Sequence, residues 1–431
     1  MGIWHTPIID GVVPQVVRAL VVVVVLVLAV RRWRWRPFLW ALAGAVAGAV
    51  VAVAVFYISN ITGAFGDDLP DFVLKWSTVI LAACGFAIGG MVAASAWRRV
   101  VSVIAVIVFL LWGVVSINAK FGLNPTLGSL FGMPVEPLIT LPDAQGGAAP
   151  ASDQPLADTW TAPAGMPAVG ERGSIPIPGT VSGFDARDAG IYLPPAALVP
   201  NAPALPFVIM MMGQPGNPDP TTISDVLDRY AAEHDGLAPI VIVADQIGPD
   251  GRDPVCADSK ELGNARTYVT VDVVAWAKQN LHIIDDPAYW TIAGYSNGGS
   301  CAITWGAQEP DVWKNIIDIS GEEFAGSDHV DEVVRRVYGG SQSAFEASKP
   351  ANIMAAAAPG TYAGTTAVFT AGSLDEEYTA AADTVSAAAK AAGMTVTRYE
   401  VPDQTHTGPI VELSLAEGFR VLYPVLGLST G

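Results

Sequence analysis

The chain has 431 residues, of which 51% are hydrophobic and only 15% are charged, and its mean hydropathy is +0.41. These values exclude an ordinary soluble protein, and the apolar excess is concentrated at the N-terminus. The net charge is -18, but the first 118 residues hold eight Lys or Arg and four Asp or Glu. The remainder therefore carries 15 basic and 37 acidic residues. This acidity argues against nucleic acid, or an anionic membrane surface, as a partner of the C-terminal part.

Four apolar stretches within residues 1–118 predict a transmembrane anchor of about four helices, at residues 12–30, 37–57, 76–97 and 100–118. Each is close to the ~20 residues that a helix needs to cross a bilayer. The first stretch is not preceded by a basic segment, and further spans follow it at once. We therefore interpret it as a membrane helix and not as a signal peptide.

Basic residues indicate how these spans are oriented. Arg31, Arg32, Arg34 and Arg36 lie between the first and second spans, and Arg98 and Arg99 lie between the third and fourth. Loops rich in Lys and Arg stay in the cytoplasm. The loop at residues 59–71 has three Asp and no Lys or Arg, so it is expected outside. The N-terminus and everything after residue 118 are then extracytoplasmic.

Beyond the spans, residues 119–172 are predicted to be a juxtamembrane segment and a linker rich in Ala, Pro and Gly. From residue 173 to 431 strands alternate with helices. Strands are expected at residues 174–178, 190–193, 205–212, 239–244, 289–293, 316–319, 367–370 and 395–401. Helices are expected at residues 222–233, 268–281, 300–308, 344–358, 376–392 and 411–422. This alternation predicts a mostly parallel sheet with helices on both faces.

The most informative motif is Gly294-Tyr-Ser-Asn-Gly298, a G-x-S-x-G pattern between an expected strand and an expected helix. This is the context of a nucleophile elbow, a sharp turn that exposes a serine hydroxyl. The same pattern occurs by chance in loops rich in Gly and Ser, but the flanking elements favour Ser296 as a nucleophile.

A serine nucleophile needs a base, usually a histidine that a carboxylate orients. In hydrolases of this architecture the chain order is serine, acid, histidine. Only His329 and His406 follow Ser296. We expect His406 to be the base because it follows the last strand, at the sheet edge where catalytic groups gather. His329 precedes any suitable strand end, and the alternative for His406 is an exposed loop histidine.

The acid should follow the strand before the last one. Asp375 comes three residues after Gly372, at the start of that loop, and is the expected acid. Glu376 and Glu377 are typical of the first turn of a helix, where their negative charge interacts favourably with the helix dipole. The fallback is a pair of acids after the preceding strand, Glu322 and Glu323.

An oxyanion hole requires two backbone N–H groups. Asn297, directly after the nucleophile, should supply one, and the loop after the strand at residues 205–212 should supply the other. We expect Gln214 in that loop, since Pro215 has no N–H; the alternative is an ordinary Gly/Pro turn. Asp245, Gln246 and Asp253 follow the next strand and are candidates for lining the cleft.

The cysteines are Cys84, Cys256 and Cys301, without the spacing of a zinc site. Cys84 lies in an apolar run and is expected to be buried. Cys256 and Cys301 fall in the part placed outside the cell, where disulfides are permitted. We favour a disulfide between them, which would pin the Cys256 loop beside the nucleophile; the alternative is two buried thiols.

With Ser296, Asp375 and His406 in this order, residues 173–425 resemble the esterase branch of the α/β-hydrolases, which includes esterase D and the mycolyltransferases. The whole layout is similar to that of membrane-anchored actinobacterial esterases. The segment Ile117-Asn-Ala-Lys-Phe-Gly-Leu-Asn-Pro-Thr-Leu-Gly128 and the positions of Cys256 and Cys301 also resemble that group. The resemblance implies carboxyl-ester hydrolysis or acyl transfer without a cofactor.

The chain departs from this branch at the oxyanion loop, where Gly213-Gln-Pro-Gly216 replaces a His-Gly-Gly motif. The sequence therefore predicts a multi-pass serine esterase on the outer face of the cytoplasmic membrane, with an α/β-hydrolase domain and a lipid or cell-envelope ester as substrate. One alternative is an acyltransferase that moves an acyl group to an envelope glycan or lipid. Another is an inactive envelope-binding module.

Overall fold

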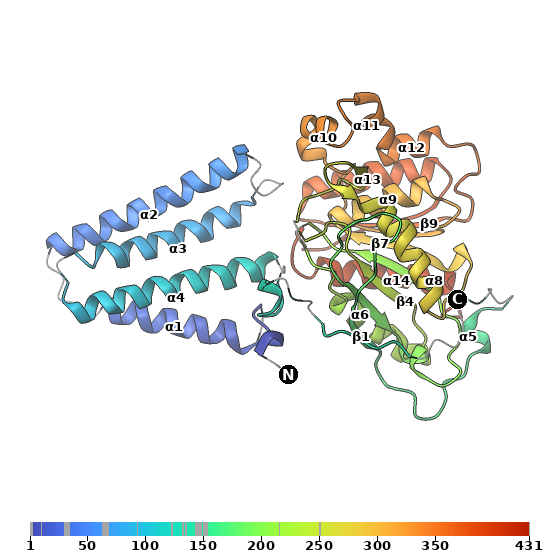
Figure 1. Cartoon of the computed structure of the whole chain (residues 1–431), viewed down its shortest axis with the longest axis horizontal. Coiled ribbons are helices and arrows are strands. Elements are labelled where there is room, and N and C mark those ends of the chain that lie inside the picture. The colour runs from blue at the N-terminus through green and yellow to red at the C-terminus, as the bar shows by residue number, and fades with distance from the viewer. Residues whose placement is uncertain are drawn as a thin grey trace. The chain divides into compact units, whose positions relative to one another are not determined.

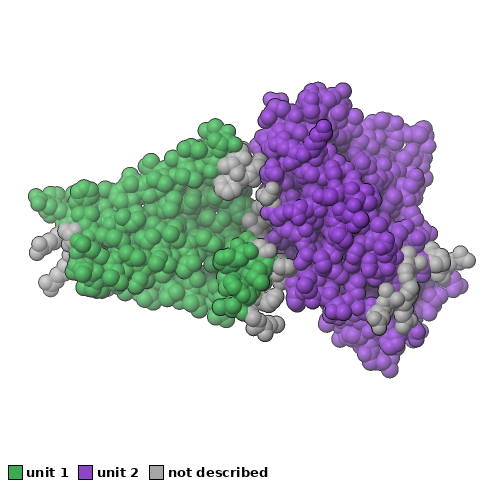
Figure 2. Space-filling model, in the orientation of Figure 1, with its two compact units in different colours: residues 1–133 green, residues 134–431 purple. Residues whose placement is uncertain are grey.

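The computed structural model describes residues 3–9, 11–29, 35–62, 69–92, 94–121, 124–131, 133, 136–142, 149, 154–214, 216–249 and 251–430. The chain forms two compact units, Met1–Met133 and Pro134–Gly431, which Figure 2 distinguishes by colour. The first unit contains four long helices, and the second contains the sheet (Figure 1).

All four helices of the first unit are long and apolar enough to cross a membrane. They are α1 (Val12–Ala29), α2 (Trp35–Thr62), α3 (Asp71–Gly89) and α4 (Ala96–Phe121). Within the unit, α3 packs between α2 and α4, and α1 packs on α4 (Figure 1). Large apolar side chains along these helices are exposed, as a lipid-facing surface requires.

The boundaries of these helices differ from those expected. Helix α3 ends at Gly89 and not near residue 97, because Gly89 and Gly90 favour termination and the Gly90 amide closes the last turn on the Phe86 carbonyl. Helix α4 begins at Ala96, so Arg98 and Arg99 lie in its first turn and not in the preceding loop. Arg31, Arg32, Arg34, Asp67 and Asp68, which support the orientation, lie outside the described residues.

Helices α2 and α3 approach each other through glycines. A Cβ atom on Gly44 would lie 2.1 Å from the carbonyl oxygen of Gly85, and one on Gly85 would lie 2.0 Å from that of Gly44. Gly48 and Gly89 meet the facing backbone in the same way. The two small-residue faces therefore allow backbone contact, which is the packing mode favoured between membrane helices.

The segment that follows α4 fastens the N-terminus to the same end of the helix bundle. The Asn118 side chain accepts a hydrogen bond from the Asn124 amide and donates one to its carbonyl. Beyond this turn, the Leu127 amide donates to the Thr6 carbonyl, and the Gly128 amide to the Trp4 carbonyl. The chain thus enters and leaves the four helices at one end.

The second unit is built on an eight-stranded sheet in the order β1-β2-β4-β3-β7-β8-β9-β10. Strand β2 pairs antiparallel with β1 and β4, and all other pairs are parallel, as expected. The strands are β1 (Glu171–Ile175), β2 (Ala189–Leu193), β3 (Phe207–Met211), β4 (Ile240–Ala244), β7 (Trp290–Tyr295), β8 (Asn315–Ile319), β9 (Thr366–Gly372) and β10 (Thr395–Val401).

Every residue of β3, β4, β8 and β9 is buried, so helices cover the central sheet on both faces. Helices α6 (Thr221–Glu233) and α14 (Ile410–Val425) pack on each other, and α9 (Asn297–Gln308) and α13 (Glu376–Ala391) pack on the strands that precede them. Strands β3, β4, β7, β8, β9 and β10 end at the same sheet edge, which brings their following loops together.

Some elements differ from the expected pattern. The single helix expected at residues 344–358 is two helices, α11 (Gln342–Ser348) and α12 (Pro350–Ala356), because Pro350 forces Lys349 into an extended conformation. The helix expected at residues 268–281 comprises α7 (Ala265–Thr267), a wide π-helical segment η4 (Tyr268–Val273) and α8 (Val274–Asn280). Helix α10 (Val330–Arg336), helix α5 (Leu156–Thr159) and the hairpin of β5 (Asp258–Ser259) and β6 (Gly263–Asn264) were not expected.

The described part of the expected linker packs on the second unit. The Ala149 amide donates to the Ile283 carbonyl, and the Ala157 amide of α5 donates to the Gly427 carbonyl. The Trp160 indole N–H donates to the Asp235 carbonyl. A segment rich in Ala and Pro is expected to be an extended linker, but these long-range hydrogen bonds attach its described residues to the sheet domain.

Candidate active site

Ser296 lies in the sharp turn between β7 and α9. Its backbone has φ 55° and ψ -121°, a conformation that residues other than glycine rarely adopt. The Ser296 amide donates to the Ile319 carbonyl of β8 at 2.8 Å, which holds the turn against the neighbouring strand. The serine is thus fixed at the carboxyl edge of the sheet.

The two glycines of the motif are required by close backbone contacts. A Cβ on Gly294 would lie 2.0 Å from the Gly298 carbonyl oxygen, and a Cβ on Gly298 would lie 2.3 Å from the Met211 carbonyl oxygen of β3. Backbone atoms cannot move aside as flexible side chains do. These positions therefore accept only glycine if the turn is to keep its shape.

His406 lies in the loop after β10, and its Nε2 atom is 2.9 Å from Ser296 Oγ. Its ring stacks on that of Tyr378, with centroids 3.9 Å apart, and more loosely on that of Tyr295 at 5.2 Å. The Tyr295 hydroxyl also donates a hydrogen bond to the His406 carbonyl. Burial raises the pKa of Tyr295, so this phenol stays neutral and keeps its donor.

Asp375 precedes the first residue of α13, and its Oδ2 atom is 3.4 Å from His406 Nδ1. This separation is longer than an ordinary N–H···O hydrogen bond, but catalytic hydrogen bonds of free enzymes are often long and shorten when substrate binds. The two loops are joined directly, since the Leu374 amide donates to the Gln404 carbonyl. Gly372 allows this approach, because a Cβ there would lie 2.4 Å from the same oxygen.

The structure places the alternative acids and base elsewhere. Among the described residues, no hydrogen bond joins His329, at the end of η6 (Ser327–His329), to Ser296. Glu376 and Glu377 lie exposed in the first turn of α13. Glu322 accepts hydrogen bonds from the Gly326 and Ser327 amides within its own loop.

The residues expected to supply the oxyanion donors are Asn297, directly after Ser296, and Gln214, in the loop after β3. Asn297 is the first residue of α9, so its N–H belongs to the N-terminal turn, which has no intrahelical acceptors. Gly213 approaches the serine so closely that a Cβ there would lie 3.1 Å from Ser296 Cβ. Gln214 follows in the same turn, and its side chain donates to the Gly251 carbonyl. Pro215 lies outside the described residues.

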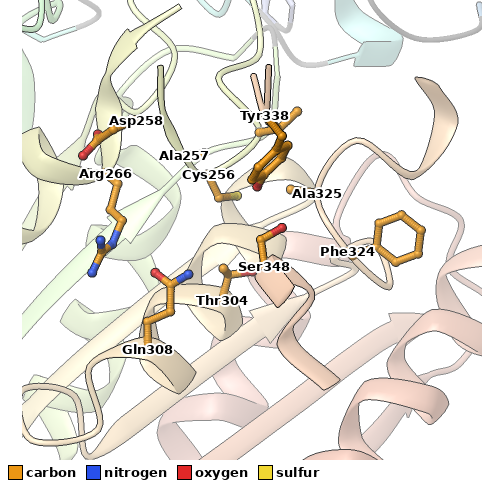
Figure 3. Close-up of a pocket in the computed structure, with 11 residues that line it drawn as sticks. Cys256, Ala257, Asp258, Arg266, Thr304, Gln308, Phe324, Ala325, Tyr338 and Ser348 are labelled. Carbon is orange, nitrogen blue, oxygen red and sulfur yellow. The ribbon is translucent and has the colours of Figure 1, made fainter. Parts of the chain in front are cut away.

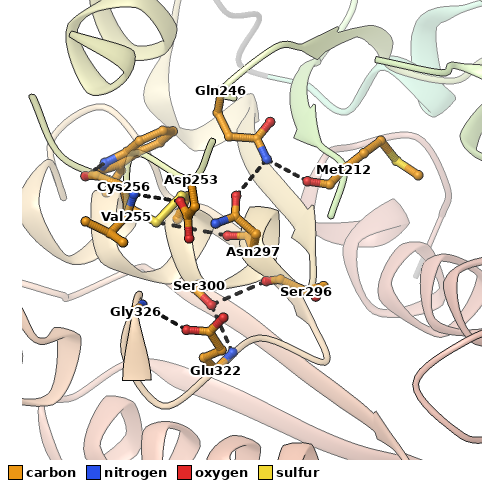
Figure 4. Close-up of a disulfide and its surroundings, with 12 residues drawn as sticks. Met212, Gln246, Asp253, Val255, Cys256, Ser296, Asn297, Ser300, Glu322 and Gly326 are labelled. Carbon is orange, nitrogen blue, oxygen red and sulfur yellow. Dashed lines mark hydrogen bonds between the residues drawn. A yellow bond between two sulfur atoms is a disulfide. The ribbon is translucent and has the colours of Figure 1, made fainter. Parts of the chain in front are cut away.

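Gln246, in the loop after β4, joins these two sides. Its buried Nε2 donates to the Met212 carbonyl at 2.6 Å and to Asn297 Oδ1 at 2.9 Å (Figure 4). One amide group therefore sets the spacing between the end of β3 and the start of α9. Asp245, its neighbour, has a different partner, since its buried carboxylate is paired with Arg187 at 2.6 Å.

Cys256 and Cys301 form a disulfide between the loop after β4 and the second turn of α9 (Figure 4). Val255 and Cys256 both have positive φ angles, 50° and 56°. The Trp305 indole N–H donates to the Cys256 carbonyl, which fastens the loop to α9 a second time. A β-branched residue at positive φ is strained, so these attachments hold a conformation the free loop would avoid.

Asp253 lies in the same loop, and the Val255 amide donates to its carboxylate. Burial raises the pKa of this carboxyl, while that amide and the Asn297 side chain lower it. Cys84, the third cysteine, is a buried free thiol in α3. No cluster of three or more His, Cys, Asp or Glu suited to a metal ion occurs within the part of the chain that the structure describes.

Two features of the site were missed in the sequence. Tyr378 stacks on His406 from the first turn of α13. At that position the sequence does not distinguish an aromatic residue of the site from an ordinary surface or core residue. Asp318 of β8 is buried behind the turn, with a Cβ on Gly299 or Gly321 falling within 3 Å of its Oδ1. Gly299, the third glycine of Gly294-Tyr-Ser-Asn-Gly-Gly299, is the feature of the sequence that indicates a close contact at this position.

Residues 185–408, a little over half of the chain, match the model of the family described as "Putative esterase". The chain is 28% identical over 394 residues to a protein of Corynebacterium glutamicum described as uncharacterized, with 88% of each chain covered. Since the second unit makes up less than 88% of the chain, that alignment includes part of the N-terminal helices.

Two solved structures are similar to the second unit. A ferulic acid esterase superposes with a TM-score of 0.51 at 14% identity, covering 60% of this chain and 99% of that one. An S-formylglutathione hydrolase from Agrobacterium tumefaciens has a TM-score of 0.49 at 17% identity, covering 60% of this chain and 96% of that one. The superposition on the ferulic acid esterase and the observed strand order confirm the α/β-hydrolase fold expected from the sequence.

Proposed function

The chain belongs to the family described as "Putative esterase" and is a carboxylic ester hydrolase with the α/β-hydrolase fold, and we propose that it is a serine esterase that acts on a lipid or cell-envelope ester. The observation that carries the proposal is the alignment of Ser296 Oγ, His406 and Asp375, with 2.9 Å between the serine oxygen and Nε2. That is the arrangement of an activated serine nucleophile.

In the first half of the reaction, Ser296 Oγ attacks the ester carbonyl while His406 Nε2 accepts its proton. Asp375 holds Nδ1–H and stabilises the imidazolium that forms. His406 then gives the proton to the departing alcohol, and the acyl group remains on Ser296. In the second half, His406 removes a proton from a water molecule as the water oxygen attacks the acyl carbonyl. His406 then returns that proton to Ser296 Oγ as the bond between the acyl carbon and Oγ breaks, which releases the acid and restores the serine.

The negative charge that develops on the carbonyl oxygen requires donors that are already in place. We assign this role to the amides of Asn297 and Gln214. Gln246 supports the assignment because it ties Asn297 to the Met212 carbonyl, two residues before Gln214. It acts through these residues and is therefore a positioning residue.

The proposed location is the outer face of the cytoplasmic membrane. Two features of the first unit support it: the chain enters and leaves the four helices at one end, and Arg98 and Arg99 stand at the start of α4, at the other end. Positively charged ends stay in the cytoplasm. At that location, the esters nearest to the catalytic unit are those of lipids and other envelope components.

The proposal is tested by lipid profiling of cells that carry Ser296→Ala against wild type. An ester that accumulates in the variant identifies the substrate class, and one that regains its wild-type level on complementation supports hydrolysis. If the variant instead lacks a glycan that carries the acyl group in wild type, the reaction is acyl transfer and not hydrolysis. A reporter fused after Gly431 that is active only in the cytoplasm would exclude the proposed orientation.

A further inference from the structure

A cavity of about 230 Å³ lies in the second unit beside α9 and the loop that carries Cys256 (Figure 3). Its walls come from the loop at residues 255–258, from α7, α9 and α11, from Tyr338 beyond the end of α10, and from the loop after β8. A single buried water needs roughly 10–15 Å³, so there is room for a larger occupant.

This cavity is separate from the catalytic site. Ser296, His406, Asp375 and Asn297 are absent from its lining. Its two α9 residues, Thr304 and Gln308, follow Ser296 by eight and twelve residues, which places them about 12 and 18 Å along the helix. Cys256 of the disulfide lines the cavity, and its Sγ lies 4.0 Å from the Asn297 carbonyl oxygen, so the disulfide forms the wall on the side of the catalytic site.

Two buried polar atoms of the lining residues have no hydrogen-bond partner among the described residues: the Nε of Arg266 and the Oε1 of Gln308. The first is a donor and the second an acceptor. Buried polar groups are nearly always satisfied, and leaving one unmet is costly. A bound molecule that offers both an acceptor and a donor would complete them.

The charges around the cavity indicate which molecule fits. Arg266 is already paired with Glu309, at 2.6 Å, and the other charged lining residue is Asp258, whose carboxylate accepts hydrogen bonds from Thr267. Arg266, the basic residue of the lining, is therefore already neutralised, which disfavours an anionic ligand. An ammonium group has no acceptor for the Arg266 Nε–H. A hydroxyl group both accepts and donates, so it suits Arg266 and Gln308 together.

The remaining walls suit a compact polyol. Thr304, Ser348 and Tyr338 contribute hydroxyls, while Phe324 and Val255 contribute apolar surface. From this lining we propose that the cavity is a second binding site, for a small neutral polyhydroxylated molecule of about monosaccharide size. Its ring carbons lie against the apolar wall and its hydroxyls bridge Arg266 and Gln308.

The test is a saturation-transfer NMR titration of the full-length protein in detergent with glucose, and with glucuronate and glucosamine as matched anionic and cationic probes. Glucose should bind saturably and more tightly than both. Gln308→Met, which removes the acceptor at equal length, should weaken binding about tenfold. Gln342→Met, on the exposed face of α11, is the matched control and should bind as wild type does.

A second variant, Ala325→Leu, fills the cavity from another wall and should also weaken binding. The proposal is overturned if no probe binds saturably, if glucuronate or glucosamine binds best, or if Gln308→Met binds glucose like wild type. Glucose should leave the KM for p-nitrophenyl butyrate unchanged; a raised KM would mean that the cavity is part of the substrate cleft. Fluorophosphonate labelling of the same samples tests Ser296 separately, so either proposal can fail alone.

Discussion

The Asp318 carboxylate occupies the space beside Gly299, where a Cβ atom would come within 2.6 Å of its Oδ1. The Gly321 amide donates to the same oxygen at 2.9 Å. Asp318 is only 3% exposed, and burial raises the pKa of its carboxyl to about 7 from an ordinary 3.8. A titrating group thus lies directly behind the turn that carries Ser296.

This raised pKa predicts how stability depends on pH. Because the folded protein binds the Asp318 proton more tightly than the unfolded chain, the free energy of unfolding falls as pH rises from about 4 to 7. The full penalty, on the order of 4 kcal/mol, is present above pH 7. Asp318→Asn keeps an acceptor for Gly321 and removes the charge, so it should stabilise the protein at pH 8 more than at pH 5. Urea unfolding at both pH values measures this, and a stability difference that does not change with pH contradicts it.

Gln246→Met should lower kcat by about 10- to 100-fold with little change in KM. The substitution removes the hydrogen bonds to Met212 and Asn297 that set the spacing of the proposed oxyanion donors. Steady-state kinetics on a p-nitrophenyl ester measure both constants, with the exposed Gln342→Met as the control. If KM rises and kcat holds, Gln246 contributes to binding and not to transition-state stabilisation.

Asp375→Asn should lower kcat by about 10³- to 10⁴-fold, since the amide cannot hold His406 in the required tautomer. Glu376→Gln and Glu377→Gln change neighbouring carboxylates in the same way and should stay within about threefold of wild type. Comparing the three variants on one ester identifies the acid. A large loss of kcat in either Glu variant, with Asp375→Asn still active, would show that the catalytic acid is a glutamate of α13.

Reduction of the Cys256–Cys301 disulfide should lower the free energy of unfolding by about 4 kcal/mol, because it closes a loop of 45 residues. The strained Val255 and Cys256 should then relax, with a fall in activity. Unfolding curves with and without dithiothreitol measure the effect. The double variant Cys256→Ala, Cys301→Ala should resemble the reduced protein and show no response to the reductant; a response there would point to another target.

Much of the fold was predictable because its signals are local. The buried strands and the elbow motif depend on runs of apolar residues and on glycine spacing, and the observed strands lie within a few residues of those expected. Pro350 is equally local, and it separates α11 from α12 because the residue before a proline avoids the helical conformation. The ends of α3 and α4 were misplaced because hydropathy does not register where a helix is capped.

The supports of the site were less predictable, because they join residues distant in the chain. Gln246 meets Asn297 across 51 residues, and nothing near Gln246 in the sequence indicates that partner. The attachment of Ala149 and of residues 156–160 to the sheet domain depends on hydrogen bonds to distant segments, which composition cannot show. Chain order was sufficient to place Asp375 and His406 near Ser296, since the strands before them are neighbours in a parallel sheet.

The most direct test of the account is fluorophosphonate labelling of the full-length protein in detergent, followed by mass spectrometry of the labelled peptide. Wild type should be labelled on Ser296, His406→Gln should be labelled far more slowly, and Ser296→Ala should not be labelled. Labelling depends on an activated serine and needs no knowledge of the natural ester. A wild-type protein that stays unlabelled, or a Ser296→Ala variant that is labelled equally, would contradict the proposed nucleophile.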